Sequence, residues 1–455
     1  MKRDRTTFLV EWLHSSMRKP LVIRGARQVG KTWLVRDLAE SQQRQLIEFN
    51  FEKRPDLQTL FISNNPDEIL INIGAYTGRT VEPSKTILFL DEIQVAPQLL
   101  SKLRWFAEDM PQLAVIAAGS LLDFTLAEHE FSMPVGRISY LYLEPLSFEE
   151  FLGARGKEEL RTYLKNYEWS IDIPEAIHLQ LIRCVKEYLV VGGMPAAVLS
   201  WKTQNDPQAV NQIHFDLLAT YRDDFAKYKG RLSIDRLEDV IKAVPLQLGK
   251  KFVYSQVNSE ATSVSLKQAL ELLSKAGVCH RIAATAANGL PLGAEANEKF
   301  LKVILLDCGL CCASLGLSLH QLTSISEIAF INSGGMAEQL AGQILRTIFP
   351  PYMPPALYYW QRQNKGSAAE VDYIIQYENQ IIPIEVKAGT TGSLKSLREF
   401  IIEKNKTLAI RVNSDKPTVY EAQITNTAGL PINYRLPSLP FYLLGQINRL
   451  INRIL

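Results

Sequence analysis

Short apolar runs alternate with helical patterns over the first third of the chain. The apolar runs cover residues 21–23, 46–51, 87–90 and 114–118, and each has the length of one buried strand. Strands that alternate with helices predict a mostly parallel sheet with helices on both faces. The first expectation is therefore an α/β domain at residues 1–150.

The pattern becomes mainly helical after residue 150 and then changes again. Two helical patterns, at residues 234–244 and 265–275, precede strand-like runs at 278–282 and 300–306. Helices followed by a hairpin are the outline of a winged helix, which can bind DNA or serve only as a structural bridge. We therefore expect residues 151–329 to form a helical segment with a winged-helix-like domain.

The last 126 residues form a third pattern, so we expect a separate α/β domain at residues 330–455. A helical pattern at 337–348 is followed by a strand-like run at 356–361 and by a hairpin pattern at 371–387. The aromatic residues of the strand-like run could stack on bases, but an aromatic strand packed in the core is the default interpretation.

A phosphate-binding sequence follows the first apolar run directly and opens a helical pattern at residues 33–40, the context that a P-loop requires. Its glycines let backbone N–H groups curl around phosphates at a helix N-terminus. Lys31 would reach the β- and γ-phosphates, and the Thr32 hydroxyl would hold magnesium. ATP and Mg²⁺ are the expected cofactors, bound by Gly25, Ala26, Arg27, Gln28, Val29, Gly30, Lys31 and Thr32.

The second half of this site is Asp91-Glu92, at the end of the buried run 87–90. Asp91 would join the magnesium shell, and Glu92 would orient and activate the attacking water. A later run ends at Gly119-Ser120, where Ser120 could sense the γ-phosphate. A Gly-Ser turn with no nucleotide contact explains that pair equally well.

The C-terminal hairpin brings two carboxylates together if its turn is Glu378-Asn379. Asp372 then faces Glu385 on a non-hydrogen-bonded pair, where side chains are closest. Like charges at such a position repel each other unless they share a cation. Because side chains alternate, Glu370 and Lys387 should share that charged face, and the opposite, apolar face should carry Val371, Tyr373, Ile384 and Val386.

Two carboxylates and a lysine on one strand face suit a metal-dependent site. Magnesium prefers oxygen ligands, which Asp372 and Glu385 would provide. Lys387 could steady a nucleophilic water or the charge that grows on a phosphate. The alternative is a vestigial site whose charges form a structural network of carboxylates and lysine.

Several short motifs of the sequence resemble those of the AAA-type ATPases of a broad bacterial and archaeal group. In that group the ATPase domain is joined to a conserved C-terminal domain. The resemblance spans the chain and rests on GARQVGKT, LFLDEIQ, AAGS, the Gly136-Arg137 pair before YLEPLSFEEF, and GGMP at residues 192–195. It implies that Arg137 is an arginine finger or sensor for the γ-phosphate, in its own or a neighbouring subunit. A solvated or ion-paired arginine is the competing interpretation.

The resemblance also implies a fold for the last domain. The order Asp372, then Glu385-x-Lys387, is similar to the PD-(D/E)xK fold of restriction endonucleases, whose helical glutamate would be Glu338. In that interpretation Glu338, Asp372 and Glu385 hold the metal, and Asp372, Glu385 and Lys387 carry the chemistry. This chain departs from the pattern at Val371, where the family has proline.

A zinc site is the weaker interpretation of the cysteines. Cys308, Cys311 and Cys312 have C-x-x-C spacing, and Cys279-His280 could add two ligands. The preceding run is a buried strand, however, and small thiols are common in cores. No second C-x-x-C or H-x₃₋₅-H accompanies them, so core cysteines are favoured.

Composition and charge limit the other classes of function. The chain has 455 residues, 47% hydrophobic and 22% charged, and a net charge of +2, which excludes a basic coat protein. Residues 330–455 alone carry 13 basic and 9 acidic side chains, so a phosphate backbone would find its basic surface there. The N-terminus does not resemble a signal peptide and no run is long enough to span a bilayer, so we expect a cytoplasmic protein without membrane contact.

Two functions are consistent with these patterns. The first is an ATPase that couples nucleotide state to a nuclease-like domain acting on DNA, with Lys250, Lys251 and Lys267 as further DNA contacts. The second is a regulatory or scaffold ATPase whose C-terminal domain binds a partner without cleaving nucleic acid. Homo-oligomerisation is compatible with both.

Overall fold

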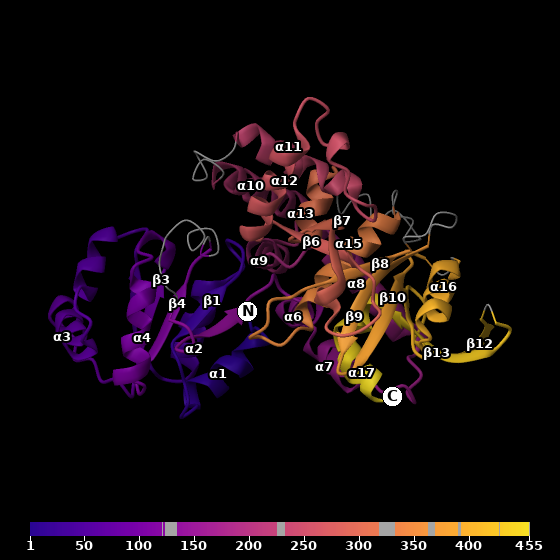
Figure 1. Cartoon of the computed structure of the whole chain (residues 1–455). Helices are drawn as coiled ribbons and strands as arrows, with labels where there is room; N and C mark the ends of the chain where they lie inside the picture. The colour runs from indigo at the N-terminus through magenta and orange to yellow at the C-terminus, as the bar shows by residue number, and fades with distance from the viewer. Residues whose placement is uncertain are drawn as a thin grey trace. The chain divides into compact units, whose positions relative to one another are not determined.

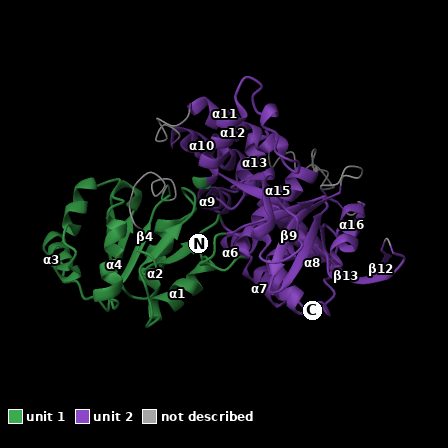
Figure 2. Cartoon of the chain, viewed as in Figure 1, with its two compact units in different colours: residues 1–145, 275–277, 349–354 green, residues 146–274, 278–348, 355–455 purple. Residues whose placement is uncertain are grey.

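The structure is a computed structural model that describes residues 1–120, 122, 134–224, 233–317, 333–362, 369–389, 393–426 and 428–454. The chain divides into two compact units (Figure 2). Unit 1 comprises residues 1–145, 275–277 and 349–354, and unit 2 comprises residues 146–274, 278–348 and 355–455.

Unit 1 contains a five-stranded parallel sheet with the order β2-β3-β4-β1-β5 (Figure 1). The four predicted apolar runs are strands of this sheet, and β5 is a fifth strand that the pattern did not reveal. All six residues of β3 are buried, as expected for a central strand covered on both faces. The strands are β1 (Leu21–Arg24), β2 (Gln45–Asn50), β3 (Thr86–Asp91), β4 (Ala114–Ala118) and β5 (Ser139–Tyr142).

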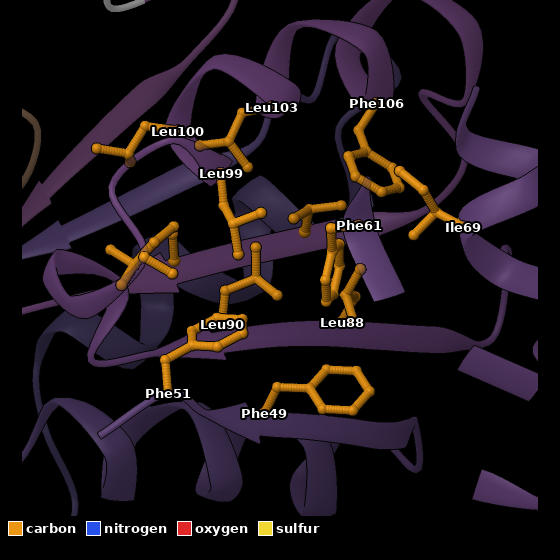
Figure 3. Close-up of a cluster of buried hydrophobic side chains, with 14 of the residues drawn as sticks. Phe49, Phe51, Phe61, Ile69, Leu88, Leu90, Leu99, Leu100, Leu103 and Phe106 are labelled. Carbon is orange, nitrogen blue, oxygen red and sulfur yellow. The ribbon is translucent and has the colours of Figure 1, made fainter. Parts of the chain in front are cut away.

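Helices cover both faces of this sheet, as the alternation of patterns predicts. Aromatic and aliphatic residues of β2 and β3 pack against α3, α4 and the 3₁₀ helix Pro55–Phe61 in one buried cluster (Figure 3). Within it, the Phe49 and Phe61 rings meet edge to face with centroids 5.7 Å apart. The helices of unit 1 are α1 (Arg5–His14), α2 (Lys31–Ser41), α3 (Pro66–Thr77) and α4 (Leu99–Asp109).

Unit 2 begins as a helical segment. Its first helix, α6, starts at a capping box in which Ser147 and Glu150 satisfy each other's backbone N–H groups. The helices before the C-terminal region are α6 (Phe148–Ala154), α7 (Glu158–Asn166), α8 (Glu175–Val191), α9 (Pro195–Gln204), α10 (Pro207–Asp224), α11 (Ile234–Ala243), α12 (Ser263–Lys275) and α13 (Cys308–Ser314). They are followed by α15 (Ser333–Thr347), α16 (Lys395–Lys404) and α17 (Ile447–Asn452).

One mixed sheet of eight strands runs through unit 2, in the order β12-β13-β11-β10-β9-β8-β6-β7. The hairpin predicted after two helices is present as β6 and β7, but β6 also pairs in parallel with β8. The sheet therefore crosses the boundary expected at residue 329, and a self-contained winged helix is not confirmed. The strands are β6 (Cys279–Thr285), β7 (Ala296–Leu305), β8 (Tyr358–Gln361), β9 (Glu370–Tyr377), β10 (Gln380–Val386), β11 (Ile410–Asn413), β12 (Thr418–Thr425) and β13 (Pro431–Pro440).

The β9–β10 hairpin has the predicted turn and register. Gln380 faces Tyr377 and Ile384 faces Tyr373, and Glu378 adopts the left-handed conformation that this turn needs. The pairing of β9 with β10 ends at Tyr373 and Ile384, one residue pair before the expected pair of Asp372 and Glu385. Beyond it, β10 pairs with β11 and the start of β9 pairs with β8.

The prediction of one apolar hairpin face is wrong in part. Val371 and Ile374 pack in the core cluster that contains α16, whereas the Tyr373 hydroxyl donates to the Glu338 carbonyl of α15. The pairing of β8 with β9 shifts register between Tyr358 and Trp360, which marks a β-bulge. Because a bulge interrupts side-chain alternation, Tyr373 leaves the face that Val371 occupies.

Two further predictions about unit 2 agree with the structure. Tyr359 and Trp360 are buried, and the Trp360 ring meets Phe400 edge to face at 5.2 Å, so this aromatic strand belongs to the core. Cys308, Cys311 and Cys312 are buried free thiols.

Among the described residues, no helix combines the length and apolar character needed to cross a bilayer.

Candidate functional site

The phosphate-binding sequence forms a tight loop between β1 and the start of α2. Gly25 and Gly30 both have positive φ values, of 152° and 97°. A Cβ on Gly25 would lie 2.3 Å from the Leu143 carbonyl oxygen, so only glycine fits there. Helix α2 begins at Lys31, and its N-terminal N–H groups and positive dipole end lie beside the loop.

Lys31 lies inside this loop and is 7% exposed. Its ammonium donates to the Gly25 carbonyl at 3.0 Å and to the Ala26 carbonyl at 2.8 Å. Burial lowers the pKa of Lys31 to about 8, against the opposing charges of Glu92 and Asp91. A bound anion at the loop would raise this pKa and stabilise the charged form of the lysine.

Thr32 and Asp91 meet at the same edge of the sheet. The Thr32 hydroxyl donates to Asp91 Oδ2 at 3.0 Å, and the Asn50 side-chain amide donates to the same oxygen at 3.2 Å. Burial, followed by the charge of Glu92, raises the pKa of Asp91. A hydroxyl and a carboxylate placed side by side are the hard oxygen ligands that Mg²⁺ prefers.

Glu92 and Ser120 also lie at this edge, because β4 is placed between β1 and β3 in a parallel sheet. Glu92 adopts a left-handed conformation and accepts a hydrogen bond from the Gln94 side chain. The Gln94 amide oxygen packs against Gly119, and both this oxygen and the Ser120 hydroxyl are buried and have no hydrogen-bond partner among the residues that the structure describes. The sequence patterns missed Gln94, whose only signal is its position two residues after Glu92.

The remaining loop residues have structural partners. Arg27 makes a 3.2 Å ion pair with Glu52, which lies two residues after the end of β2. The buried Val29 offers its carbonyl to the Arg3 guanidinium at 2.8 Å. Gln28 has a φ of 64°, which the loop requires of it as of its glycines.

Arg137 and the phosphate loop lie at opposite ends of the strands, because Arg137 lies near the start of β1 and the loop follows its end. Arg137 precedes β5, whose first residue Ser139 is level with Leu21 at the start of β1, whereas the loop follows the end of β1. The four residues of β1 span about 13 Å from one end to the other, at about 3.3 Å per residue. Arg137 is half-exposed and makes a 2.7 Å ion pair with Glu108, which is the interpretation that competes with an arginine finger.

A cluster of carboxylates in unit 2 contains the four residues predicted for a second metal site. Glu338 comes from α15, Asp372 from β9 and Glu385 from β10, with Lys387 just beyond the end of β10. Lys387 donates to Glu385 at 2.7 Å, and Asp372 Oδ2 accepts the Val386 backbone N–H at 2.8 Å. Glu385 Oε2 is buried, and within the described part of the chain it has no hydrogen-bond partner.

Lys302 from β7 occupies the centre of this cluster. Its Nζ lies 2.6 Å from Glu370, 2.9 Å from Glu338 and 3.5 Å from Asp372. The sequence patterns missed Lys302, although a signal existed. It is the one charged residue in the apolar run 300–306, and a buried ammonium requires carboxylate partners.

Crowding of these carboxylates changes their protonation. Burial, followed by the charge of Asp372, raises the pKa of Glu338 to about 8 and that of Glu385 to about 7. Lysine contacts act in the opposite direction but do not cancel this effect. Burial acts to lower the pKa of Lys302, but the charges of the neighbouring carboxylates outweigh it and raise this pKa well above its usual range.

The other predicted sites have structural explanations. Cys279 is buried, and burial raises the pKa of its thiol to about 12, the opposite of what a metal ligand needs. Lys267 lies 3.9 Å from Glu271, and Lys251 lies 4.1 Å from the centre of the Phe300 ring. Over the part of the chain that the structure describes, no three His, Cys, Asp or Glu side chains are grouped to hold a metal ion.

Three family comparisons match separate parts of the chain. The family described as an AAA domain matches residues 17–152, the region that carries the phosphate loop, Asp91 and Glu92. Residues 17–152 are therefore similar to an AAA domain, in agreement with the P-loop that they contain. Residues 182–321 match a domain of unknown function (DUF8612), and residues 333–428 match another (DUF4143). The resemblance to PD-(D/E)xK nucleases is therefore not confirmed.

Solved structures resemble the chain only loosely. A Walker-type ATPase of Pyrococcus abyssi, PABY2304, is 16% identical, with a TM-score of 0.44 over 69% of this chain and 96% of that one. The ORC2 protein of Aeropyrum pernix is 13% identical, with a TM-score of 0.35 over 71% and 96%. The RuvB branch migration motor of Thermotoga maritima is 14% identical, with a TM-score of 0.28 over 62% and 88%. A search of curated proteins found no match.

The ATPase domain fits ATP with magnesium. Glycines shape the loop, Lys31 supplies a positive charge within it, and Thr32 and Asp91 offer adjacent oxygen ligands. The Ser120 hydroxyl, which is buried and has no partner in the described ranges, is a further group that a bound nucleotide could satisfy.

The carboxylate cluster of unit 2 does not fit a divalent cation in the same way. Each of the four carboxylates already has a lysine ammonium nearby. Lys302 lies between Glu338, Glu370 and Asp372, and Lys387 contacts Glu385. A metal ion there would lie next to two like charges. We therefore derive no chemical step through a metal at this cluster.

Proposed function

We propose that unit 1 binds ATP with Mg²⁺, hydrolyses it, and passes its nucleotide state on to unit 2. Lys31 stabilises the β- and γ-phosphates, and Thr32 and Asp91 hold the magnesium ion. Glu92 orients the attacking water, with Gln94 as its positioning partner. Magnesium supplies charge neutralisation at the phosphates when it is bound.

The observation that carries this proposal is the hydrogen bond from Thr32 to Asp91. It joins the helix that follows the phosphate loop to the end of β3, two segments 59 residues apart in the sequence. The two oxygens meet beside the buried Lys31 ammonium. This arrangement of positive charge and hard oxygen ligands at a helix N-terminus favours a nucleotide with its magnesium ion over a simple anion.

The test is ATP turnover by the purified full chain, with Lys31→Ala beside Lys53→Ala. Lys53 is an exposed lysine outside the loop, so its loss controls for a general change of charge. We expect Lys31→Ala to lose turnover while it keeps the wild-type circular dichroism, and Lys53→Ala to retain turnover. Full turnover in Lys31→Ala would overturn the assignment of the phosphate site.

For unit 2, we propose a restriction-endonuclease-like sheet that engages DNA. The β9–β10 hairpin, the helical Glu338 and the excess of basic residues in 330–455 support this part of the proposal. Arg137 would act on the nucleotide of a neighbouring copy, because it lies at the opposite end of the strands from its own phosphate loop.

A second candidate is a unit that binds its partner without cutting nucleic acid. Lys302 favours this candidate, because its ammonium lies where the carboxylates would otherwise share a metal ion. Plasmid and short DNA, incubated with Mg²⁺ or Mn²⁺ and with or without ATP, distinguish the two. Cutting that disappears in both Asp372→Ala and Lys387→Ala would support a nuclease, and an absence of cutting under every condition would leave the second candidate.

A further inference from the structure

Lys302 of β7 is a buried lysine whose ammonium contacts three carboxylates. Its side chain is 3% exposed, and three carboxylates from two other elements surround its Nζ within 3.5 Å. The Tyr359 ring lies on a further side, with its centre 5.4 Å from Nζ. The ammonium is therefore fully enclosed by groups that attract a cation.

The charged groups of this cluster come from elements that are not adjacent in the sheet. Lys302 pairs with Ile282 of β6, and two strands, β6 and β8, separate β7 from β9. Its long side chain reaches Asp372 of β9 and Glu338 of α15. A residue that only filled β7 would be apolar, as its neighbours Leu301 and Val303 are. An isolated buried ammonium is costly, so the lysine and the carboxylates require one another.

We propose that Lys302 is a resident cation that closes the carboxylate cluster of Glu338, Glu370 and Asp372 to divalent metals. The cluster then holds α15 and β9 to β7 through an internal ammonium. Removing that ammonium opens a metal site whose ligands are these three carboxylates, with Glu385 beside them. This inference goes beyond the proposed ATP chemistry and stands on contacts within unit 2.

The geometry also explains why one lysine can substitute for a metal here. An ammonium has three hydrogens in a compact tetrahedral arrangement and carries one charge. Three carboxylate partners can each accept one of them. A divalent ion needs oxygen ligands at about 2.0–2.6 Å, whereas the three Lys302 contacts lie at 2.6, 2.9 and 3.5 Å. Two of the three contacts are longer than a metal–ligand bond, so the present spacing suits an ammonium.

The experiment measures Mn²⁺ binding to nucleotide-free full-length protein by electron paramagnetic resonance. We compare the wild type with Lys302→Met, which keeps the unbranched side chain up to Cε and removes the ammonium, and with Lys302→Arg, which keeps a charge. Lys302→Met should gain one site that binds at least tenfold more tightly than any site of the wild type, and Lys302→Arg should not. Adding Asp372→Asn to Lys302→Met should abolish the gained site.

Two outcomes would overturn the proposal. One is a folded Lys302→Met variant that gains no site. The other is a wild-type site that disappears in the single variant Asp372→Asn, which would show that the native cluster already takes a metal. The second comparison decides the question even if Lys302→Met does not fold. Retention of ATP turnover in Lys302→Met would separate this result from any failure of the proposed ATP function.

Discussion

The Thr32 hydroxyl lies 3.0 Å from the Asp91 carboxylate and donates a hydrogen bond to it. Thr32 is the second residue of α2 and Asp91 the last residue of β3. Their contact fixes where a magnesium ion would lie relative to the phosphate loop. The two residues should therefore act together on magnesium and much less on the nucleotide base.

The first prediction concerns this magnesium pair. Thr32→Val removes the hydroxyl but keeps the shape, so the Mg²⁺ concentration for half-maximal ATP turnover should rise at least tenfold, the equivalent of about 1.4 kcal/mol of lost ligand energy. Thr32→Ser retains the hydroxyl and should keep a requirement near that of the wild type. A magnesium titration of turnover measures both, and equal requirements in all three proteins would contradict the assignment.

The second prediction concerns the buried carboxylate of Asp307, which lies against the glycine pair at residues 192–193. This carboxylate accepts hydrogen bonds from the backbone N–H groups of Gly193 at 2.6 Å and Gly309 at 2.9 Å, and from the Gln343 amide at 2.9 Å. A Cβ on Gly192 would lie 2.0 Å from it. Asp307→Asn turns an amide donor toward these donors and should lower the unfolding free energy of unit 2 by about 3 kcal/mol.

Urea unfolding followed by tryptophan fluorescence measures that loss. Asp206→Asn is the matched control, because Asp206 is exposed and accepts one backbone N–H, from Gln208 at 2.9 Å. That variant should lose less than about 1 kcal/mol. Equal losses in the two variants would show that the buried network around Asp307 does not stabilise unit 2.

The third prediction concerns pH and Glu338. Burial and the charge of Asp372 raise the pKa of Glu338 from its ordinary 4.5 to about 8 in the folded state. Between these two values the folded protein binds more protons than the unfolded chain, so stability falls as pH rises. One ammonium on Lys302 does not neutralise three carboxylates, which is why a proton remains favourable at the cluster.

Urea midpoints between pH 5 and pH 8, measured with a chelator present, test this dependence. The wild type should lose stability across this range, and Glu338→Gln, which has no proton to lose, should show a flatter profile. Parallel profiles would show that Glu338 does not titrate in this window.

Local patterns of the sequence were sufficient to predict most of the AAA-type domain. The phosphate loop is a contiguous sequence whose glycines, lysine and threonine are read without knowing the fold, and the four apolar runs gave four of the five strands. The placement of Arg137 could not be obtained that way. It depends on β5 pairing with β1 from the N-terminal end, which is a long-range pairing.

The carboxylate cluster shows the same division between local and tertiary information. The turn at Glu378-Asn379 fixed the hairpin register correctly, because a two-residue turn determines register locally. The bulge near Asp372 and the approach of Lys302 depend on β8 and on the order of eight strands. Nothing in the hairpin sequence itself encodes them.

Replacement of Glu92 by glutamine tests the central claim most directly, since it keeps the shape of the side chain and removes the carboxylate that would activate water. Equilibrium binding of a fluorescent ATP analogue and steady-state ATP turnover are measured on the same preparation of Glu92→Gln. We predict that binding remains within about threefold of the wild type, while turnover falls by at least about a hundredfold. Wild-type turnover in Glu92→Gln, or loss of binding in the folded variant, would contradict the role of this edge of the sheet in ATP hydrolysis.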